Sequence, residues 1–456
     1  METILEQIAA RAAGGVAVTT ENRVAARNAI ADTLACMVAG QGDMAVLAAR
    51  SALLRAGHEG ASTLVGGGSA DPAQAAMING IAAHALDFDD NFGPGMSHAS
   101  AVLVPALLAL GETLDVSGAA FIDAYLTGLE AQALVGAGVR PEHYAAGWHA
   151  TSTVGAIGTA AGCAALLGLD HAGVVQAMSL AVSSAAGMKG QFGTPAKPFH
   201  AGMAARNAVE AALLARSGLY GRADILERAQ GFGALMGGGA AAAWTMPEAA
   251  TPHVIETDGL MPKIHPCCGS THNSVDMIVA LRREHGFTAD DVDSIVLTVG
   301  RANFRNLAYP EPLTAMEGRF SMQYCVALAL FEDELSLADF TDAAVMRPHL
   351  RALFSKITME VMPPEQEQGS TRPPHQARVQ LKDGRVLTAS LAHARGTLMD
   401  PLSEDARRFK LRDCFAAAGL PFDASMQATL DDIDSLAALK PLAKLVARKP
   451  GRSEAA

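Results

Sequence analysis

The chain has 456 residues, which is too long for one ordinary hydrophobic core and predicts two or three domains. Half of the residues are hydrophobic but only 5% are aromatic, so the core must consist of alanine, valine, leucine and methionine on closely packed helices. The formal net charge is -12, and no stripe of lysine and arginine is interleaved with aromatic residues, which argues against nucleic acid or an anionic membrane as partner.

The cysteines and the N-terminus point to the cytoplasm. The six cysteines show neither a CxxC pair nor the spacing of a disulfide framework. The first fifteen residues carry acidic side chains and lack the cationic start and apolar run of a signal peptide. Apolar runs such as residues 101–110 are too short to span a bilayer. A small anionic ligand remains compatible with this composition, because a pocket can be locally basic.

Residues 22–250 are predicted to be almost entirely helical. Within residues 155–169, glycine and alanine recur at spacings of three and four, which lets helix backbones approach closely. Another helix is expected in residues 204–221, where glycines end the pattern. The other expected helices are residues 22–38, 71–85, 102–114, 118–135 and 153–167.

After the glycine- and alanine-rich residues 233–243 the pattern changes to mixed strands and helices. Strands are expected over residues 293–299 and 356–362, and residues 377–391 predict a hairpin that turns at Asp383-Gly384. Helices are expected between the strands and again from Asp400 onward. Periodicity alone does not decide whether these last helices rejoin the first domain. The intervening helices are residues 321–331 and 338–345.

Two histidines and three aspartates gather between His84 and His98, in the stretch HALDFDDNFGPGMSH. Charged side chains leave water only when they are paired, protonated or bound to a ligand, so this cluster between apolar helices predicts a reaction site. The alternative is a solvated loop with a helix cap and no chemistry.

Three further polar segments stand in apolar surroundings, each directly before an expected helix: residues 147–153, 194–200 and 263–272. Their helix starts expose backbone N–H groups and the positive end of the helix dipole, which can hold a carboxylate. Lys197 and Lys263 would add full positive charge. The alternative for each segment is a capping motif with a packed histidine.

Cofactor and metal motifs are missing from the sequence. There is no HExxH set, and the adjacent Cys267 and Cys268 cannot readily place both sulfurs on one tetrahedral ion. Residues 66–69 and 237–240 lack the lysine or the strand–turn–helix context of a phosphate-binding loop, and no GxSxG elbow occurs. We therefore expect no cofactor and no metal, and acid–base chemistry by aspartate, histidine and lysine, such as proton abstraction beside a carboxylate.

The segments HALDFDDNF, SHASAVLVPALLALGE, GWHATSTVGAIGTAAG, AKPFHAGMAARNAVEAALLA and EGRFSMQYCVALAL resemble the MmgE/PrpD family in order and spacing. The resemblance covers nearly the whole chain. It implies a mainly α fold, with a large discontinuous all-helical domain (residues 1–258 and 398–456) and a smaller α+β lid domain (residues 259–397), usually in a homodimer. The family activities are 2-methylcitrate dehydration, cis-aconitate decarboxylation and iminodisuccinate epimerisation, all without a cofactor.

The resemblance also implies which residues line the pocket. Asp87, His98, His149 and Lys197 match positions expected to be catalytic, and Asn91, His200, Lys263 and Tyr324 match positions expected to bind substrate, with Asp89 and Asp90 as second choices. The lysines would anchor carboxylates and stabilise an enolate-like intermediate, His149 or His98 would be the base, and Asp87 would orient a histidine or act as an acid.

Two positions depart from the cis-aconitate decarboxylase pattern, because this chain has Asn91 where those enzymes have threonine and Ala99 where they have proline. The motifs GWHxTST and EGxFSxxYC resemble the iminodisuccinate epimerase-like branch of the family more than the cis-aconitate decarboxylases. We expect a lyase (dehydratase or decarboxylase) acting on a small di- or tricarboxylate. An epimerase-like isomerase is the first alternative, and a non-catalytic carboxylate-binding dimer is the second.

Overall fold

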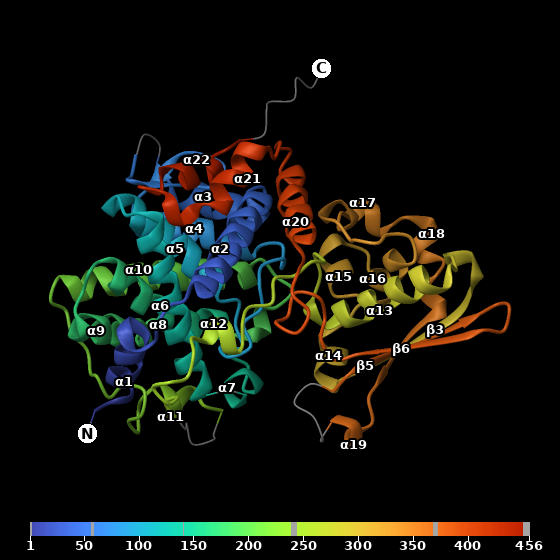
Figure 1. The fold of residues 1–456 in the computed structure, drawn as a ribbon, viewed down its shortest axis with the longest axis horizontal. Coiled ribbons are helices and arrows are strands. Elements are labelled where there is room, and N and C mark those ends of the chain that lie inside the picture. Colours follow the sequence, from blue (N-terminus) through green and yellow to red (C-terminus); the bar gives the residue numbers. More distant parts are fainter. Residues whose placement is uncertain (1, 56–58, 140, 239–243, 368–372, 450–456) are drawn as a thin grey trace. The chain divides into compact units, whose positions relative to one another are not determined.

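The computed structural model describes residues 2–55, 59–139, 141–238, 244–367 and 373–449 (Figure 1). The chain forms two compact units, which are called unit 1 (Met1–Met261 with Cys414–Ala456) and unit 2 (Pro262–Asp413). The sequence placed the divisions after residues 258 and 397. Helix α20 (Glu404–Ala417) spans the second division, and its Asp413 accepts a 2.8 Å hydrogen bond from the backbone N–H of Leu337 in unit 2.

Unit 1 is built mainly from helices, and most of the predicted ones are confirmed to within a few residues. The helix expected over residues 204–221 instead runs from Ala196 to Arg216. Of the described residues between 217 and 253, only Phe232–Met236 are helical, so the prediction of nearly continuous helix up to residue 250 was wrong there. Capping residues set several helix starts: the Thr19 side chain accepts from the Asn22 N–H, and that of Ser117 accepts from the Ala120 N–H. The helices are α1 (Ile4–Ala10), α2 (Thr20–Gly40), α3 (Met44–Leu53), α4 (Pro72–His84), α5 (Ser100–Leu114), α6 (Gly118–Ala137), α7 (Glu142–Ala145), α8 (Ala150–Leu166), α9 (His171–Val182), α10 (Ala196–Arg216), α11 (Phe232–Met236), α12 (Val254–Thr257), α21 (Ala424–Asp431) and α22 (Lys440–Val446).

Helices α4, α5, α8 and α10 pack against one another at the centre of unit 1, and α6 packs along α8. The small residues predicted to allow close packing do so. A Cβ atom on Gly158 would lie 2.4 Å from the backbone nitrogen of Gln132, and one on Gly162 would lie 2.7 Å from the carbonyl oxygen of Ala124. Larger side chains at these two glycines would push α8 away from α6.

Unit 2 contains a four-stranded sheet in the order β4-β3-β5-β6. The predicted strands are confirmed: β3 (Val292–Val299) pairs parallel with β4 (Ile357–Val361) and antiparallel with β5 (His375–Leu381), which forms the predicted hairpin with β6 (Val386–Leu391). The buried apolar residues of helices α13 (Gly269–His285) and α16 (Met322–Ala329) share the unit 2 core with the alternate buried residues of β3 and β5. The mainly α fold with a smaller α+β part is confirmed.

Two local features differ from the sequence analysis. The short strands β1 (Ser62–Thr63) and β2 (Ser69–Ala70) pair within unit 1 and were not predicted. The helix expected over residues 338–345 is instead a 3-10 turn (Leu337–Asp339) followed by α17 (Asp342–Val345), because Thr341 adopts extended backbone and caps α17. The remaining short helices of unit 2 are α14 (Arg301–Asn306), α15 (Ala315–Arg319), α18 (Pro348–Arg351) and α19 (Pro364–Glu367).

Within the described ranges, no single helix is both long and apolar enough to cross a membrane. The bent pair of α2 and α3 meets the length and composition requirement when the two helices are taken together. The middle and C-terminal half of α2 is buried in unit 1.

Candidate active site

The loop that joins α4 to α5 carries four buried polar side chains, those of Asp87, Asp89, Asp90 and Ser97. His84 is the last residue of α4, and Asp87 follows with φ of +52°, a left-handed conformation that few residues other than glycine adopt. The backbone groups of Phe92 and Ser97 bond to each other at 2.8 and 3.1 Å and close the turn. Strained backbone that the surrounding structure maintains is typical of functional sites.

Asp89 lies between two imidazoles. Its Oδ2 is 2.8 Å from Nδ1 of His84 and 3.2 Å from Nδ1 of His98. Burial raises the pKa of Asp89, but the two histidines lower it more strongly, so its pKa falls well below the usual value. Burial lowers the pKa of His84 to about 4. At neutral pH, an ionised Asp89 therefore accepts a hydrogen bond from a neutral His84, whose Nε2 carries a lone pair.

Lys197 and Asp87 form an ion pair next to these histidines. Nζ of Lys197 lies 2.7 Å from Oδ1 of Asp87, and the two side chains are only 11% and 9% exposed. Nε2 of His98 lies 3.9 Å from the same oxygen, and the Phe192 ring centroid is 5.3 Å from Nζ. The structure thus brings together three of the four predicted catalytic residues around one carboxylate.

His149, the fourth predicted catalytic residue, joins the group through His84 and His200. The ring centroid of His84 lies 4.5 Å from that of His98 and 5.7 Å from that of His149. Nδ1 of His149 and Nδ1 of His200 are 3.1 Å apart. Burial, followed by the positive charges of neighbouring groups, lowers the pKa of His149 well below its usual value. These residues, with Asp87, Asp89 and Lys197, are called the histidine cluster below.

Three helix starts contribute to the histidine cluster. His98 lies two residues before α5, His149 is the N-cap of α8, and Lys197 is the second residue of α10. The predicted position of His149 directly before a helix is confirmed, whereas Lys197 and His200, expected before a helix that begins at residue 204, lie within α10 because that helix already begins at Ala196. Because a helix N-terminus carries partial positive charge, the arrangement favours a negatively charged ligand.

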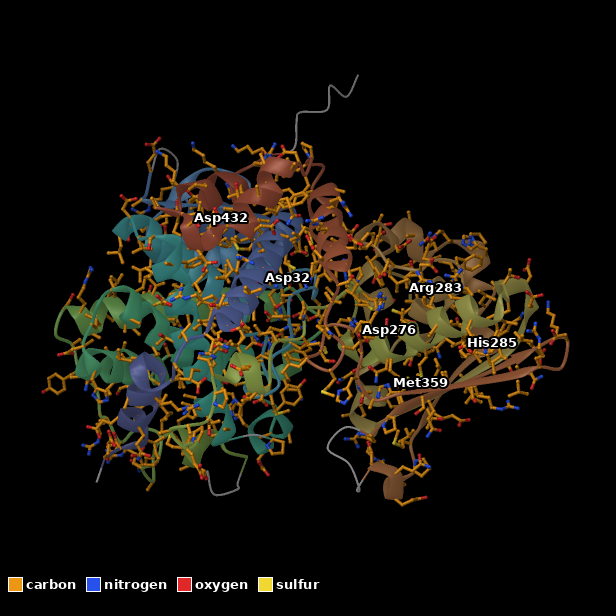
Figure 2. The ribbon with its side chains drawn as sticks, viewed as in Figure 1. Asp32, Asp276, Arg283, His285, Met359 and Asp432 are labelled. Atoms are coloured by element: carbon orange, nitrogen blue, oxygen red, sulfur yellow. The ribbon has the colours of Figure 1, made fainter. Side chains whose placement is uncertain are left out.

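Asp90 points into a separate buried network. It accepts hydrogen bonds from the Oγ and the backbone N–H of Ser100 at the start of α5, and Ser100 Oγ lies 2.7 Å from the hydroxyl of Tyr125 on α6. Burial raises the pKa of Asp90 to about 7, with further contributions from Asp32, which lies on α2 (Figure 2), and from Asp89. Asp90 therefore titrates near neutral pH.

The histidine cluster also has the side chains needed to hold a metal ion. One ligand atom each from His84, Asp87, Asp89 and His98 lies within 4.8 Å of the others. In this structure, however, Lys197 neutralises Asp87, and two imidazoles face Asp89. A divalent cation would have to displace the ammonium group, so the side chains are arranged better for proton transfer than for a metal. That the site works without a metal stays a prediction.

The other predicted substrate-binding residues have different surroundings. Asn91 pairs through its backbone with Met261, with two hydrogen bonds of 2.9 Å. Lys263 and Tyr324 belong to unit 2, and both are buried there. The Tyr324 hydroxyl donates to the carbonyl of Asp339, and burial raises the pKa of Tyr324 to about 12. Their roles in substrate binding stay predictions.

Unit 2 contains an acid–histidine pair of its own. Nε2 of His265 lies 3.0 Å from Oδ1 of Asp276, which lies on α13 (Figure 2). Asp276 also accepts a 2.9 Å hydrogen bond from Arg395, whose guanidinium binds both oxygens of Glu334. The sequence analysis gave no role to Asp276, Arg395 or Glu334, which lie far apart in the chain.

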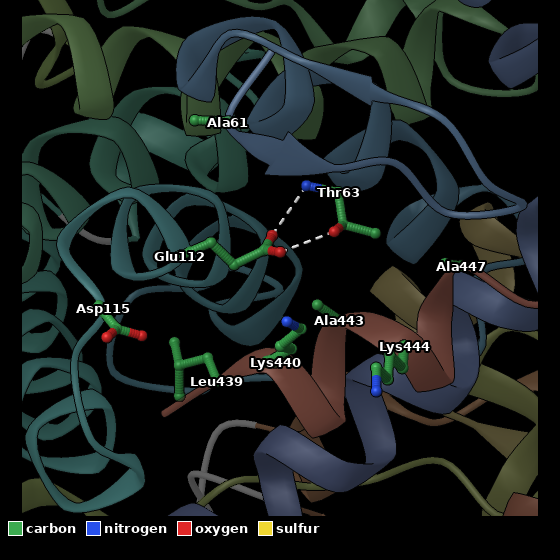
Figure 3. A pocket seen from close by; sticks show the side chains of 9 residues that line it. All are labelled: Ala61, Thr63, Glu112, Asp115, Leu439, Lys440, Ala443, Lys444 and Ala447. Carbon is green, nitrogen blue, oxygen red and sulfur yellow. Dashed lines mark hydrogen bonds between the residues drawn. The ribbon is translucent and has the colours of Figure 1, made fainter. Parts of the chain in front are cut away.

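A surface pocket of about 310 Å³ lies elsewhere in unit 1, between the end of α5 and helix α22 (Figure 3). Glu112 in its wall accepts hydrogen bonds from the backbone N–H and the hydroxyl of Thr63, at 2.8 and 2.6 Å. Lys440 and Lys444 are exposed at its edge. The histidine cluster contributes no residue to this pocket.

Comparison with known proteins places this arrangement in a family. The family models for the MmgE/PrpD N-terminal and C-terminal domains match residues 7–245 and 265–433. The chain belongs to the MmgE/PrpD family. The cis-aconitate decarboxylase of Mus musculus is 31% identical over 75% of this chain and 71% of its own length. That of Homo sapiens is 30% identical over 80% and 75%, and that of Aspergillus terreus is 26% identical over 85% and 84%.

In this MmgE/PrpD protein, the sequence analysis placed His84 in the polar stretch but gave it no catalytic role. The sequence could have indicated this role, because His84 and Asp89 are five residues apart on either side of the end of α4. This spacing allows the 2.8 Å contact between His84 Nδ1 and Asp89 Oδ2. Nothing in the sequence indicated Phe192, whose ring lies edge-on to that of His149 with the ring centroids 4.9 Å apart.

Proposed function

We propose that this MmgE/PrpD lyase acts on a small di- or tricarboxylate through a carbanion or enolate-like intermediate beside a carboxylate. The observation that carries the proposal is the histidine cluster. The ring centroids of His84 and His149, both neutral and buried, lie 5.7 Å apart, next to the Lys197–Asp87 ion pair. A neutral imidazole can take a proton from carbon or, once protonated, return it. The partial positive charge at the starts of α5, α8 and α10 stabilises the negative charge that develops.

Decarboxylation is the outcome that we favour. The relatives named above are cis-aconitate decarboxylases. Loss of carbon dioxide leaves an electron pair on carbon, and the carbon must then take up one proton. Because His84 and His149 are neutral, a histidine of the cluster would first take this proton from solvent and then deliver it to the carbon skeleton. Dehydration needs the opposite first step, in which a base removes a proton before the hydroxyl leaves. The same neutral imidazoles with nearby positive charge would serve either reaction.

The proposal is tested by incubating the protein in heavy water with cis-aconitate, 2-methylcitrate, citrate and iminodisuccinate. Carbon dioxide release, alkene absorbance and optical rotation separate decarboxylation, dehydration and epimerisation. We expect carbon dioxide release from cis-aconitate and one deuterium in the product, because the cluster exchanges its protons with solvent. Change in optical rotation alone, with iminodisuccinate, would instead identify the epimerase-like alternative.

His149→Ala provides the matched variant for this assay. The substitution removes the imidazole but leaves the backbone of the α8 N-cap, so the fold should persist while turnover falls about 10²–10⁴-fold. Turnover retained by His149→Ala would exclude His149 as the proton-transfer group. If a carboxylate raises the melting temperature of the wild type and no substrate is converted or exchanged, the chain is a binding protein and the proposal is wrong.

A further inference from the structure

The contact between His149 and His200 fixes where one proton lies. Their Nδ1 atoms are 3.1 Å apart, and the two residues are only 2% and 6% exposed. A hydrogen bond between two imidazole nitrogens needs one N–H group and one lone pair, so one of the two Nδ1 atoms is protonated and the other is not.

The two possible arrangements have different consequences for His149. If Nδ1 of His149 donates, its Nε2 carries a lone pair and can act as a base. If Nδ1 of His149 accepts, its Nε2 carries the proton, and the remaining lone pair is engaged by His200. Within the described part of the chain, Nε2 of His149 is buried and has no hydrogen-bond partner. It is therefore the nitrogen available to a substrate.

Only the first arrangement lets His149 accept a proton without breaking the contact. When Nε2 takes up a proton, Nδ1 still carries its N–H and still donates to His200. In the second arrangement, proton uptake would place two N–H groups against each other. The other groups that lower the pKa of His149 by their charge are His84, Lys197 and His98. An uncharged acceptor such as neutral His200 preserves that low pKa, whereas a carboxylate partner would raise it.

The backbone around the two histidines holds their rings at this spacing. The N–H of His149 donates to the carbonyl of Gly187 at 3.0 Å, and the hydroxyl of Ser152 donates to the carbonyl of His200 at 3.1 Å. Gly187 has φ of +125°, and a Cβ atom there would lie 2.9 Å from Cβ of Ser152 and 3.3 Å from Cγ of His200. A glycine is thus required where the three segments meet.

We propose that His200 is a positioning residue whose Nδ1 accepts the Nδ1–H of His149 and so keeps the lone pair of His149 on Nε2. This inference rests on the proposed function and replaces the predicted role of His200 in substrate binding. His200 acts through His149 and does not itself touch the substrate.

Two substitutions of His200 and one control test the role. In His200→Asn, the amide oxygen can take the place of Nδ1 as acceptor, so we expect kcat within about 10-fold of the wild type. His200→Phe keeps an aromatic ring but removes the acceptor, so kcat should fall about 10²–10³-fold while KM changes little. His171→Asn, at an exposed histidine in unit 1, serves as the control and should leave both constants unchanged. A large rise in KM with unchanged kcat in His200→Phe would show substrate contact and overturn the proposal.

The protonated nitrogen can be read directly by nitrogen NMR of the full chain labelled with ¹⁵N-histidine, with the His149 signals identified by their loss in His149→Asn. We expect Nδ1 of His149 to carry the proton in the free enzyme and in His200→Asn. A proton on Nε2 would overturn the proposal even if His200→Phe does not fold. If the wild type converts none of the acids but Nδ1 of His149 is protonated, the proposed function fails while the proton assignment holds.

Discussion

Replacing Asp90 by asparagine is expected to change how the free energy of unfolding depends on pH. Burial, with the negative charges of Asp32 and Asp89, raises the pKa of Asp90 from 3.8 to about 7. A carboxyl group with a higher pKa in the folded state holds its proton more tightly there. Its stabilising contribution is therefore complete below about pH 3.8 and is lost as the pH rises through 7.

The size of this effect follows from the two pKa values. A difference of about 3 pH units corresponds to roughly 4 kcal/mol, of which about 2–3 kcal/mol is lost between pH 5 and pH 8. The introduced asparagine would not titrate, and its amide could donate to the Ser100 hydroxyl and accept from the Ser100 N–H, as protonated Asp90 can. We expect Asp90→Asn to gain about 2–3 kcal/mol relative to the wild type over that pH range.

Urea unfolding at several pH values measures this difference. Both tryptophans, Trp148 and Trp244, belong to unit 1, so their fluorescence follows the unit that contains Asp90. Groups that do not interact with Asp90 titrate equally in both proteins, so the difference between the curves reports Asp90 and its coupling to Asp32 and Asp89. Asp258→Asn, at an exposed position that follows α12 in unit 1, should show a constant difference from the wild type. A constant difference for Asp90→Asn as well would refute the reasoning.

Two further predictions concern the histidine cluster. Lys197→Met leaves Asp87 buried without its cation and should lower the free energy of unfolding by about 3–5 kcal/mol, whereas Arg222→Met, which breaks an exposed ion pair of 2.8 Å, should cost at most about 1 kcal/mol. Equal losses in urea unfolding would contradict the burial argument. Prolonged treatment with a chelator should leave turnover unchanged, because Lys197 already neutralises Asp87; loss of activity that a divalent metal restores would show that the cluster binds a metal.

The strands and most helices could be predicted because local patterns determine them. The alternation of buried and exposed residues predicts strand β3, and Asp383-Gly384 predicts the hairpin turn between β5 and β6. Gly384 has the positive φ, +93°, that such a turn requires. The pair β1 and β2 could not be predicted in this way. Each has two residues, too few to show alternation, and three successive glycines with positive φ (Gly66–Gly68) form the turn between them.

The residue types of the site could be predicted, but their partners could not. Asp87 was expected to orient a histidine, yet Lys197 binds it at 2.7 Å, while Asp89 is the carboxylate that faces His84 and His98. A shift of two residues along the chain exchanges these roles. Which aspartate meets which base depends on the left-handed backbone at Asp87, and aspartate adopts that conformation too rarely for the sequence to indicate it.

These pairings determine the charge that a substrate meets. The charges of Asp87 and Lys197 cancel, and His84 and His149 are neutral at pH 7, so among these residues and Asp89 the remaining formal charge is that of Asp89. The partial positive charge of the starts of α5, α8 and α10 offsets it. A carboxylate can therefore approach while the imidazoles remain uncharged. An imidazole that takes up a proton, from solvent in decarboxylation or from carbon in dehydration, then places its new positive charge beside the carbanion.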